Sequence, residues 1–172
     1  SPLRRTPQSG AVVETSEIHD IKMHCTCRLF GQSFGPTIYH RRKNAMALEI
    51  VTVPCLADNY AFLLHESDTG ETALIDAPES FPILNELKKR NWQLTEIWIT
   101  HHHADHVDGI HEIRDETGAK VIGGSVDKDR LPPLNAAFND GDSFKFAGHQ
   151  VNVLDVSGHT VGHIAFHVPD AP

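Results

Sequence analysis

A cluster of histidines in the second half of the 172-residue chain is the part of the sequence best suited to chemistry. Residues 100–106 read THHHADH and directly follow the apolar run Ile97–Ile99. Neutral imidazoles and a carboxylate are ligands that zinc and similar divalent metals prefer. Four histidines and one aspartate within six positions are too concentrated for an ordinary surface, and the run is internal and interrupted, unlike a tag. The segment therefore predicts a metal site.

The spacing of these residues predicts how they divide between ions. If the chain leaving the apolar run is still extended, its side chains alternate, so that His101 and His103 point together while His102 points away. Asp105 and His106 follow where a helical pattern begins, so they leave in other directions and can serve a second ion. Two metals side by side can hold a bridging hydroxide. We therefore expect one ion on the first pair and a second ion on the last two residues.

Alternating strands and helices are predicted to position this loop. One helix has Pro82 in its first turn and cations at 88–90 in its last turn, and a second is expected to be capped by Asp108 and stopped by Gly118. The first three strands should form a meander, and the connection through the first helix favours a parallel neighbour. The predicted strands are 48–53, 61–65, 72–76, 96–100, 120–123, 144–146, 150–156 and 163–168.

The charge distribution divides the chain into two parts. Residues 1–45 hold seven Lys or Arg against three Asp or Glu, whereas residues 46–172 hold eight against twenty, so a +4 segment precedes a −12 segment. The first segment also has scattered proline and glycine without a sustained apolar period, which predicts a disordered or non-native N-terminal extension. A metal site at His24, Cys25 and Cys27 lacks a fourth ligand, and the acids of this segment argue against a transit peptide.

Composition narrows the class of protein. The chain is 40% hydrophobic and has no apolar run long enough to cross a bilayer, so we expect no membrane partner. We also expect a monomer. Three cysteines, an odd number without the spacing of a disulfide framework, indicate a reducing compartment and predict a cytoplasmic location. The −12 segment would repel phosphate, which argues against a nucleic-acid partner.

Three motifs together resemble a known family. The THHHADH segment resembles the metal signature of the metallo-β-lactamase superfamily, and residues 53–60 (VPCLADNY) and 158–163 (GHTVGH) resemble its glyoxalase II branch, the hydroxyacylglutathione hydrolases. The resemblance runs from about Met46 to the C-terminus and covers only the first part of that family's length. It implies that residues 46–172 form a partial domain with an α/β (α+β) fold, about the first half of an αββα sandwich plus the start of the second half.

The resemblance also implies an activity. Enzymes of this branch hydrolyse S-(2-hydroxyacyl)glutathione thioesters, such as S-lactoylglutathione, to a 2-hydroxy acid such as lactate and glutathione, the second step of methylglyoxal detoxification. They use two divalent metals, here expected to be zinc with iron or manganese as alternatives, to deliver hydroxide to the thioester carbonyl. Asp105 would be the catalytic residue that orients the hydroxide as well as a ligand. The expected partner is thus a small-molecule glutathione thioester.

The resemblance assigns roles outside the histidine loop. His159, in a glycine-flanked turn, would complete the first metal's ligands with His101 and His103. Asp76 ends an apolar strand, where a carboxylate needs hydrogen-bond partners, and the matching acid of the family supports the metal loop. His163 alternates on a strand with apolar residues and is interpreted as a neighbour of the ligands that does not bind the metal.

One cysteine and three further histidines are predicted to have no part in the chemistry. Cys55 is predicted to be a buried structural thiol, because a metal hydroxide needs no covalent partner. His65, His111 and His149 are predicted to lie on the surface. No motif predicts the residues that bind substrate.

The chain departs from the family at its C-terminal end. Glyoxalase II enzymes supply a bridging aspartate and a last histidine ligand from segments after the turn that matches His159, and residues that bind glutathione later still. The only acid of this chain after His159 is Asp170, which is too close to match the bridging position. The sequence therefore predicts about one metal in this chain and turnover impaired by truncation.

Two alternatives remain open at this point. A persulfide dioxygenase of the same superfamily uses a single iron and carries a similar HxHADH loop, although the motif at 53–60 and the run through His102 favour the hydrolase. The chain could also be an inactive metal-binding fragment that holds one ion without turnover. Lactamases are disfavoured because their signature does not usually place a histidine at the position of His106.

Overall fold

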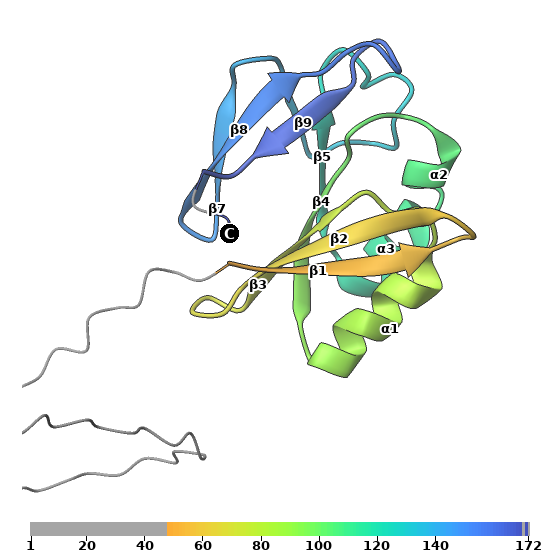
Figure 1. The fold of residues 1–172 in the computed structure, drawn as a ribbon, viewed down its shortest axis with the longest axis vertical. Helices are drawn as coiled ribbons and strands as arrows, with labels where there is room; N and C mark the ends of the chain where they lie inside the picture. The colour runs from red at the N-terminus through yellow and green to blue at the C-terminus, as the bar shows by residue number, and fades with distance from the viewer. Residues whose placement is uncertain (1–47, 170, 172) are drawn as a thin grey trace, which may run out of the picture. The chain divides into compact units, whose positions relative to one another are not determined.

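Two β-sheets organise the part of the chain that the computed structural model describes, residues 48–169 and Ala171. The described strands are β1 (Leu48–Cys55), β2 (Asn59–Glu66), β3 (Glu71–Ile75), β4 (Gln93–Trp98), β5 (Lys120–Gly124), β6 (Ala136–Phe138), β7 (Ser143–Phe146), β8 (His149–Asp155) and β9 (Ile164–His167). The described helices are α1 (Ser80–Arg90), α2 (Ala104–Val107) and α3 (Ile110–Thr117). Figure 1 shows how these elements are arranged.

The strand order confirms the expected topology. The larger sheet runs β1-β2-β3-β4-β5-β6, and the smaller sheet runs β7-β8-β9. Strands β1, β2 and β3 form the predicted antiparallel meander, whereas β4 lies parallel to β3 after the crossover through α1. Strand β5 is parallel to β4 in turn. The carboxyl ends of β3, β4 and β5 therefore lie at one edge of the sheet, and the loops that follow them meet there.

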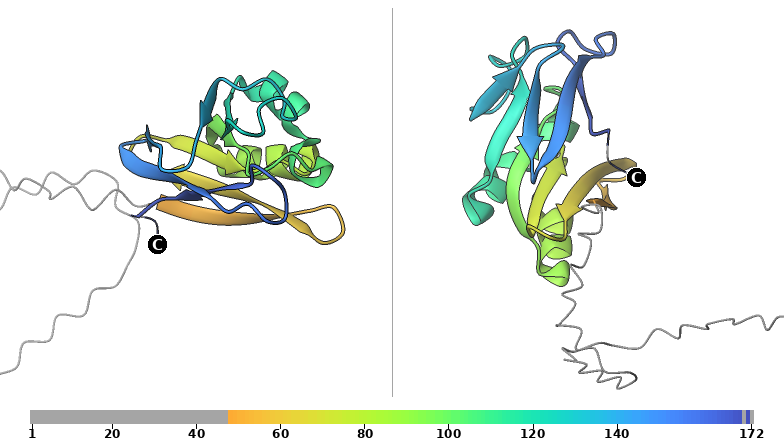
Figure 2. Two further views of the ribbon diagram at one scale, coloured as in Figure 1. Left: turned by 90° about the horizontal axis from the view of Figure 1, so that it is seen from above. Right: turned by 90° about the vertical axis from the view of Figure 1, so that its left-hand side faces the viewer.

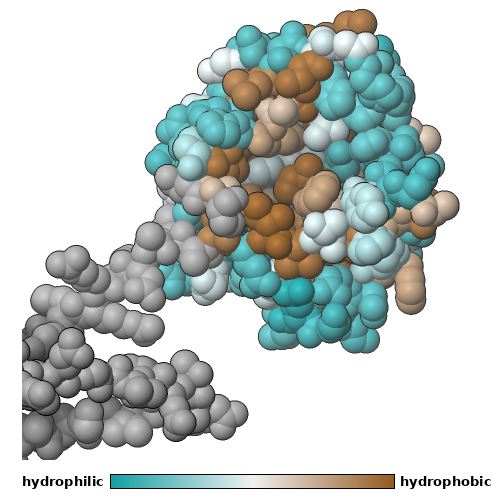
Figure 3. All heavy atoms as spheres, in the orientation of Figure 1, coloured by the Kyte–Doolittle hydropathy of each residue, from teal (hydrophilic) through white to brown (hydrophobic). Residues whose placement is uncertain are grey.

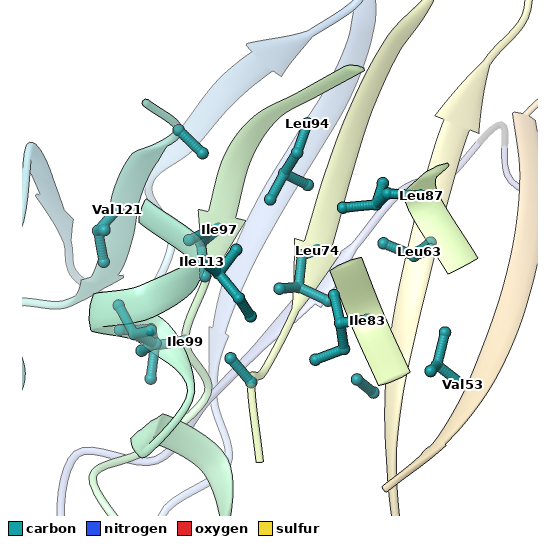
Figure 4. Packing of buried hydrophobic residues seen from close by; sticks show 14 of the residues in the cluster. Val53, Leu63, Leu74, Ile83, Leu87, Leu94, Ile97, Ile99, Ile113 and Val121 are labelled. Carbon is teal, nitrogen blue, oxygen red and sulfur yellow. The ribbon is translucent and has the colours of Figure 1, made fainter. Parts of the chain in front are cut away.

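Helices α1 and α3 pack on one face of the larger sheet. Ile83 and Leu87 from α1 and Ile113 from α3 are buried against sheet residues such as Leu74 and Ile97, and Figure 4 shows these side chains converging. Helix α1 ends at Arg90, in the predicted basic last turn, and its C-cap Asn91 has a left-handed φ of 56°. The apolar face that the sequence predicted for this helix is confirmed.

The smaller sheet covers the other face of the larger one, opposite the helices (Figure 2). Trp98 of β4 is 1% exposed, and its ring meets Phe144 and Phe146 edge-on at centroid distances of 5.2 and 5.3 Å. Phe166 of β9 completes the contact at 5.2 Å. Alternate residues of β4 thus enter two cores, one beneath the helices and one between the sheets.

Several predicted boundaries are wrong. Strand β4 covers residues 93–98, not 96–100, so the chain has already left the strand at Ile99. Asp108 does not cap the following helix: it is the C-cap of the short, unpredicted α2, and Gly109 begins α3 without a side-chain cap. An added Cβ at Gly109 would lie 2.7 Å from the backbone carbonyl carbon of Glu79. The close approach of these two backbone segments therefore requires glycine at position 109. Gly118 does stop α3, with φ of 70°.

The prediction of surface positions is wrong for two of three histidines. His65 and His149 are 8% and 3% exposed, whereas His111 lies exposed on α3. His65 is buried because both faces of β2 are covered at the end of this strand. Side chains that alternate between the two faces are therefore all buried there. Its ring stacks on Trp92 with centroids 4.0 Å apart. Strand β6 was also not predicted, because residues 136–138 carry too short an apolar signal.

The predicted extension at 1–45 and the weighed site at His24, Cys25 and Cys27 lie outside the described residues. Among the described helices, none has the length and apolar character needed to span a bilayer.

We expect Ile83→Ala to lower the free energy of unfolding by about 2 to 5 kcal/mol, because the fully buried side chain leaves a cavity beneath the sheet. Phe81→Ala in the same helix is the matched control: Phe81 is 79% exposed, so its loss should change the free energy by no more than about 0.5 kcal/mol. Denaturant unfolding followed by circular dichroism measures both, and equal effects would contradict the packing of α1.

Candidate metal centre

Two loops far apart in the sequence form the candidate site. The first, residues 99–106, leaves β4, and the second, residues 156–163, joins β8 to β9. The backbone N–H of Ile99 still donates to the carbonyl of Ile122 at 2.8 Å, and that of Ile164 donates to the carbonyl of Thr100 at 3.1 Å. The start of the first loop is therefore fixed to β5 on one side and to β9 on the other.

Three histidines from these loops converge. The ligand atoms of His101, His103 and His159 all lie within 4.8 Å of one another. His103 Nδ1 and His159 Nε2 are 3.0 Å apart. His101 is 2% exposed, and its buried Nε2 has no hydrogen-bond partner among the described residues. A buried nitrogen lone pair beside two further imidazole nitrogens is the donor set of an open zinc-type site, so these residues fit a divalent metal.

Asp76 determines which nitrogen of His101 is available. Its carboxylate accepts hydrogen bonds from the Thr100 N–H at 2.8 Å and from the Thr100 hydroxyl at 2.8 Å. Because the one hydrogen of that hydroxyl is used in the bond to the carboxylate, its oxygen must accept the hydrogen bond from His101 Nδ1 at 3.0 Å. His101 Nδ1 therefore carries the ring proton, and Nε2 is left unprotonated for a metal.

The same carboxylate holds His106. His106 Nδ1 donates to Asp76 Oδ2 at 2.8 Å, so Nε2 is the nitrogen that the neutral ring would offer to a metal; it lies 3.6 Å from Asp105 Oδ2. Asn59 holds Asp105 in turn, because its Nδ2 donates to the Asp105 carbonyl at 2.7 Å and to Oδ2 at 3.1 Å. The expected second ligand pair thus has facing donor atoms, although the converging group of three histidines does not include it.

The electrostatics of the site differ between its histidines. Burial, helped by the neighbouring imidazoles, lowers the pKa of His101 to about 4. The hydrogen bond to Asp76 raises the pKa of His106, against the opposing effect of burial. Burial also lowers the pKa of His163. At neutral pH the His101 ring is therefore neutral, as a metal ligand must be.

The remaining predicted residues are not part of the converging group of three histidines. The His163 ring stacks on His101 at a centroid distance of 4.4 Å, and its position agrees with a neighbour of the ligands. Cys55 is 2% exposed, and burial raises the pKa of its thiol, as for an unreactive structural residue. Asp76 lies at a left-handed φ of 58° directly after β3.

The sequence interpretation missed the residues that support the loop. Asn59 lies inside the quoted VPCLADNY motif, yet nothing in its type indicated the contact with Asp105. Asp127, whose Oδ2 lies 2.8 Å from His102 Nδ1, is one of several acids in a turn and carries no signal of its burial. Both contacts join residues more than twenty positions apart, so only the folded chain shows them.

A groove of about 730 Å³ opens beside the centre. It runs between the two sheets and is mostly apolar, with Thr100 and His163 among its lining residues. Figure 3 shows apolar residues gathered around a hollow on this side of the molecule. Phe62 and Ile50, which contribute to the lining, are 40% and 47% exposed.

Comparison with known proteins identifies the family of this chain. The model of the metallo-beta-lactamase superfamily matches residues 59–172. The hydroxyacylglutathione hydrolase of Ruegeria pomeroyi is 60% identical over 124 residues, which are 72% of this chain and 49% of that protein. The hydroxyacylglutathione hydrolase of Roseobacter denitrificans is 60% identical over 126 residues, 73% of this chain and 49% of that protein. The chain spans about half the length of the curated relatives it matches.

Solved structures share the fold at lower identity. BJP-1, a subclass B3 metallo-beta-lactamase of Bradyrhizobium japonicum, is 20% identical with a TM-score of 0.62, over 72% of this chain and 55% of that one. ETHE1 from Myxococcus xanthus is 25% identical with a TM-score of 0.57, over 72% of this chain and 54% of that one. With a family model that spans residues 59–172 and the fold of these structures, the chain belongs to the metallo-β-lactamase superfamily.

Proposed function

We propose that this chain provides the metal-binding half of a hydroxyacylglutathione hydrolase, which cleaves S-(2-hydroxyacyl)glutathione to a 2-hydroxy acid and glutathione. The convergence of His101, His103 and His159 is the observation that carries the proposal. The identity of 60% to two proteins named hydroxyacylglutathione hydrolase supports the choice of substrate class. We also propose a cytoplasmic location. Cys55, which is buried and forms no disulfide, supports this part of the proposal.

The three converging histidines would hold the first metal, proposed to be zinc. A bound divalent metal supplies Lewis acidity for polarising the thioester carbonyl and activating water. Asp105 and His106 would contribute to a second site, since Asp105 Oδ2 and His106 Nε2 face one another at 3.6 Å. The bridging carboxylate of that site is proposed to come from the part of the relatives' length that this chain does not span.

Asp76 and Asp105 would have different roles in the proposed reaction. Asp76 holds a proton on His106 Nδ1 and, through Thr100, the ring proton of His101 on Nδ1, so the neutral form of each ring would offer Nε2 to a metal. Asp105, held by Asn59, would accept a hydrogen bond from the attacking water and direct its lone pair towards the carbonyl. The leaving group is a thiolate, which is stable enough in water to need no protein acid.

We expect the chain to retain about one zinc ion per molecule, and His103→Ala to abolish retention because two imidazoles cannot form the three-ligand site. His163→Ala should leave most of the zinc bound, since His163 contacts His101 only through ring stacking. His111→Ala, on the exposed face of α3, is the matched control. Zinc content after gel filtration measures all three. Full retention by His103→Ala would exclude the proposed ligand set.

We expect the 172-residue chain to hydrolyse S-lactoylglutathione with zinc, but far below the rate of about ten per second typical of enzymes. The reason is that Asp105 and His106 alone are an incomplete second site, so the attacking water is less well positioned. Absorbance of the thioester measures the rate. Turnover at typical enzyme rates with two tight zinc ions would contradict the incomplete second site. If the chain instead bound iron and consumed oxygen when glutathione persulfide was added, the persulfide dioxygenase would be the correct function.

A further inference from the structure

His102 is the histidine of the 101–106 run that belongs to neither expected ligand pair, and its ring has a specific partner. His102 Nδ1 lies 2.8 Å from Asp127 Oδ2, and Asp127 is 1% exposed. A carboxylate only accepts hydrogen bonds, so Nδ1 carries the proton. Because His102 is bonded in sequence to His101 and His103, anchoring its ring fixes the backbone from which both ligand side chains leave.

Arg130 extends this contact to the second loop. Its Nη2 lies 2.5 Å from Asp127 Oδ1, an ion pair without the alignment of a hydrogen bond. The same Nη2 donates to the carbonyl oxygen of Val161 at 2.8 Å. Val161 lies two residues after His159, the ligand that comes from the second loop. Asp127 and Arg130 thus connect the segment that carries His101 and His103 to the segment that carries His159.

The packing leaves little room between these segments. Gly162 has φ of 85°, and a Cβ added there would lie 3.1 Å from Val126 Cγ1 and 3.4 Å from Asp127 Cβ. The side chains of the turn that carries Asp127 therefore pack closely against the backbone of the second loop at Gly162. The ion pair and hydrogen bond of Arg130 and this close approach both join the turn at 126–130 to the second loop, so the second loop is held to that turn at two points.

A buried carboxylate is costly unless charged or hydrogen-bonded groups compensate it. The groups in contact with the Asp127 carboxylate are His102 and Arg130, one from each direction. An ion pair that served stability alone could lie anywhere in the fold. This one joins the two loops whose histidine nitrogens must approach to 3.0 Å.

We propose that Asp127, His102 and Arg130 form a positioning clamp that holds the two ligand-bearing loops at the separation a metal requires, and thereby sets metal affinity. The three residues do not bind the metal in this proposal. It rests on the metal site of the proposed function. Mutation of residues that orient metal ligands typically lowers metal affinity by about 10- to 100-fold, and we expect a loss of this size when the clamp is broken.

Zinc affinity of the full 172-residue chain, measured by competition with a chromophoric chelator, tests the clamp. His102→Ala and Arg130→Ala should each weaken affinity by about 10- to 100-fold at a temperature where the metal-free variants are folded. The double variant should lose little more than the weaker-binding single variant, because both changes cut one connection. His102→Asn should recover much of the loss, since an amide N–H can replace Nδ1–H. His111→Ala should bind as the wild type does.

A second measurement needs no metal. The Gly162 amide, which donates to Ser157 Oγ at 3.2 Å, reports opening of the second loop. In the metal-free chain, His102→Ala should speed its hydrogen exchange by about tenfold, as expected for loss of a hydrogen bond to a charged group. The Gly118 amide at the end of α3 is the control and should not change.

The outcomes separate the clamp from the proposed function. If the wild type binds zinc and both alanine variants bind it equally well, the clamp is wrong while the metal site stands. If the wild type binds no zinc, the proposed function is wrong, and the exchange rate of Gly162 alone decides the clamp. Unchanged exchange in His102→Ala would then overturn it.

Discussion

The carboxylate of Asp76 is the constraint on which the metal centre depends. It lies where β3 ends, in a left-handed backbone conformation with φ of 58°, and its own N–H donates to the carbonyl of Trp98 at 2.9 Å. From this position it accepts hydrogen bonds from Thr100 and His106. A single negative charge thus sets the tautomers of two histidines and fixes the start of the ligand loop. Its burial, with 6% exposed, makes these contacts obligatory.

The layers of the fold explain why such a site can form at this edge. Parallel pairing of β3, β4 and β5 brings their following loops together, and the helices cover one face of the larger sheet. The smaller sheet supplies the remaining loop through β8 and β9. Ligands on loops whose ends are fixed to buried strands are held more rigidly than ligands on free loops.

The sequence predicted the elements better than their ends. Periodicity was sufficient for α1 because its buried residues Ile83 and Leu87 lie on one face, against the larger sheet. It failed for His65, which is buried at the end of β2 where both sides of the strand are covered. It also failed for Asp108, because the N-cap of α3 is Gly109, which has no capping side chain and lies too close to the backbone of Glu79 to carry a Cβ.

The candidate site shows the same division. The motifs and the family resemblance predicted a set of ligands, and the structure brings three of them, His101, His103 and His159, together. Metal ligands can be predicted in this way because their residue types and spacing are characteristic. The supporting contacts of Asn59 and Asp127 were not predicted. An amide in a loop or an acid in a turn is common in any sequence, and its function appears only when distant segments meet.

X-ray absorption spectroscopy of the zinc-loaded chain tests the central claim, that three imidazoles from two distant loops form one metal site. The claim predicts a zinc edge spectrum fitted by nitrogen and oxygen neighbours at about 2.0 to 2.1 Å, with the multiple scattering of three imidazole rings. A sulfur shell at about 2.3 Å would place the metal on cysteine instead, and the absence of imidazole scattering would contradict the converging histidines directly.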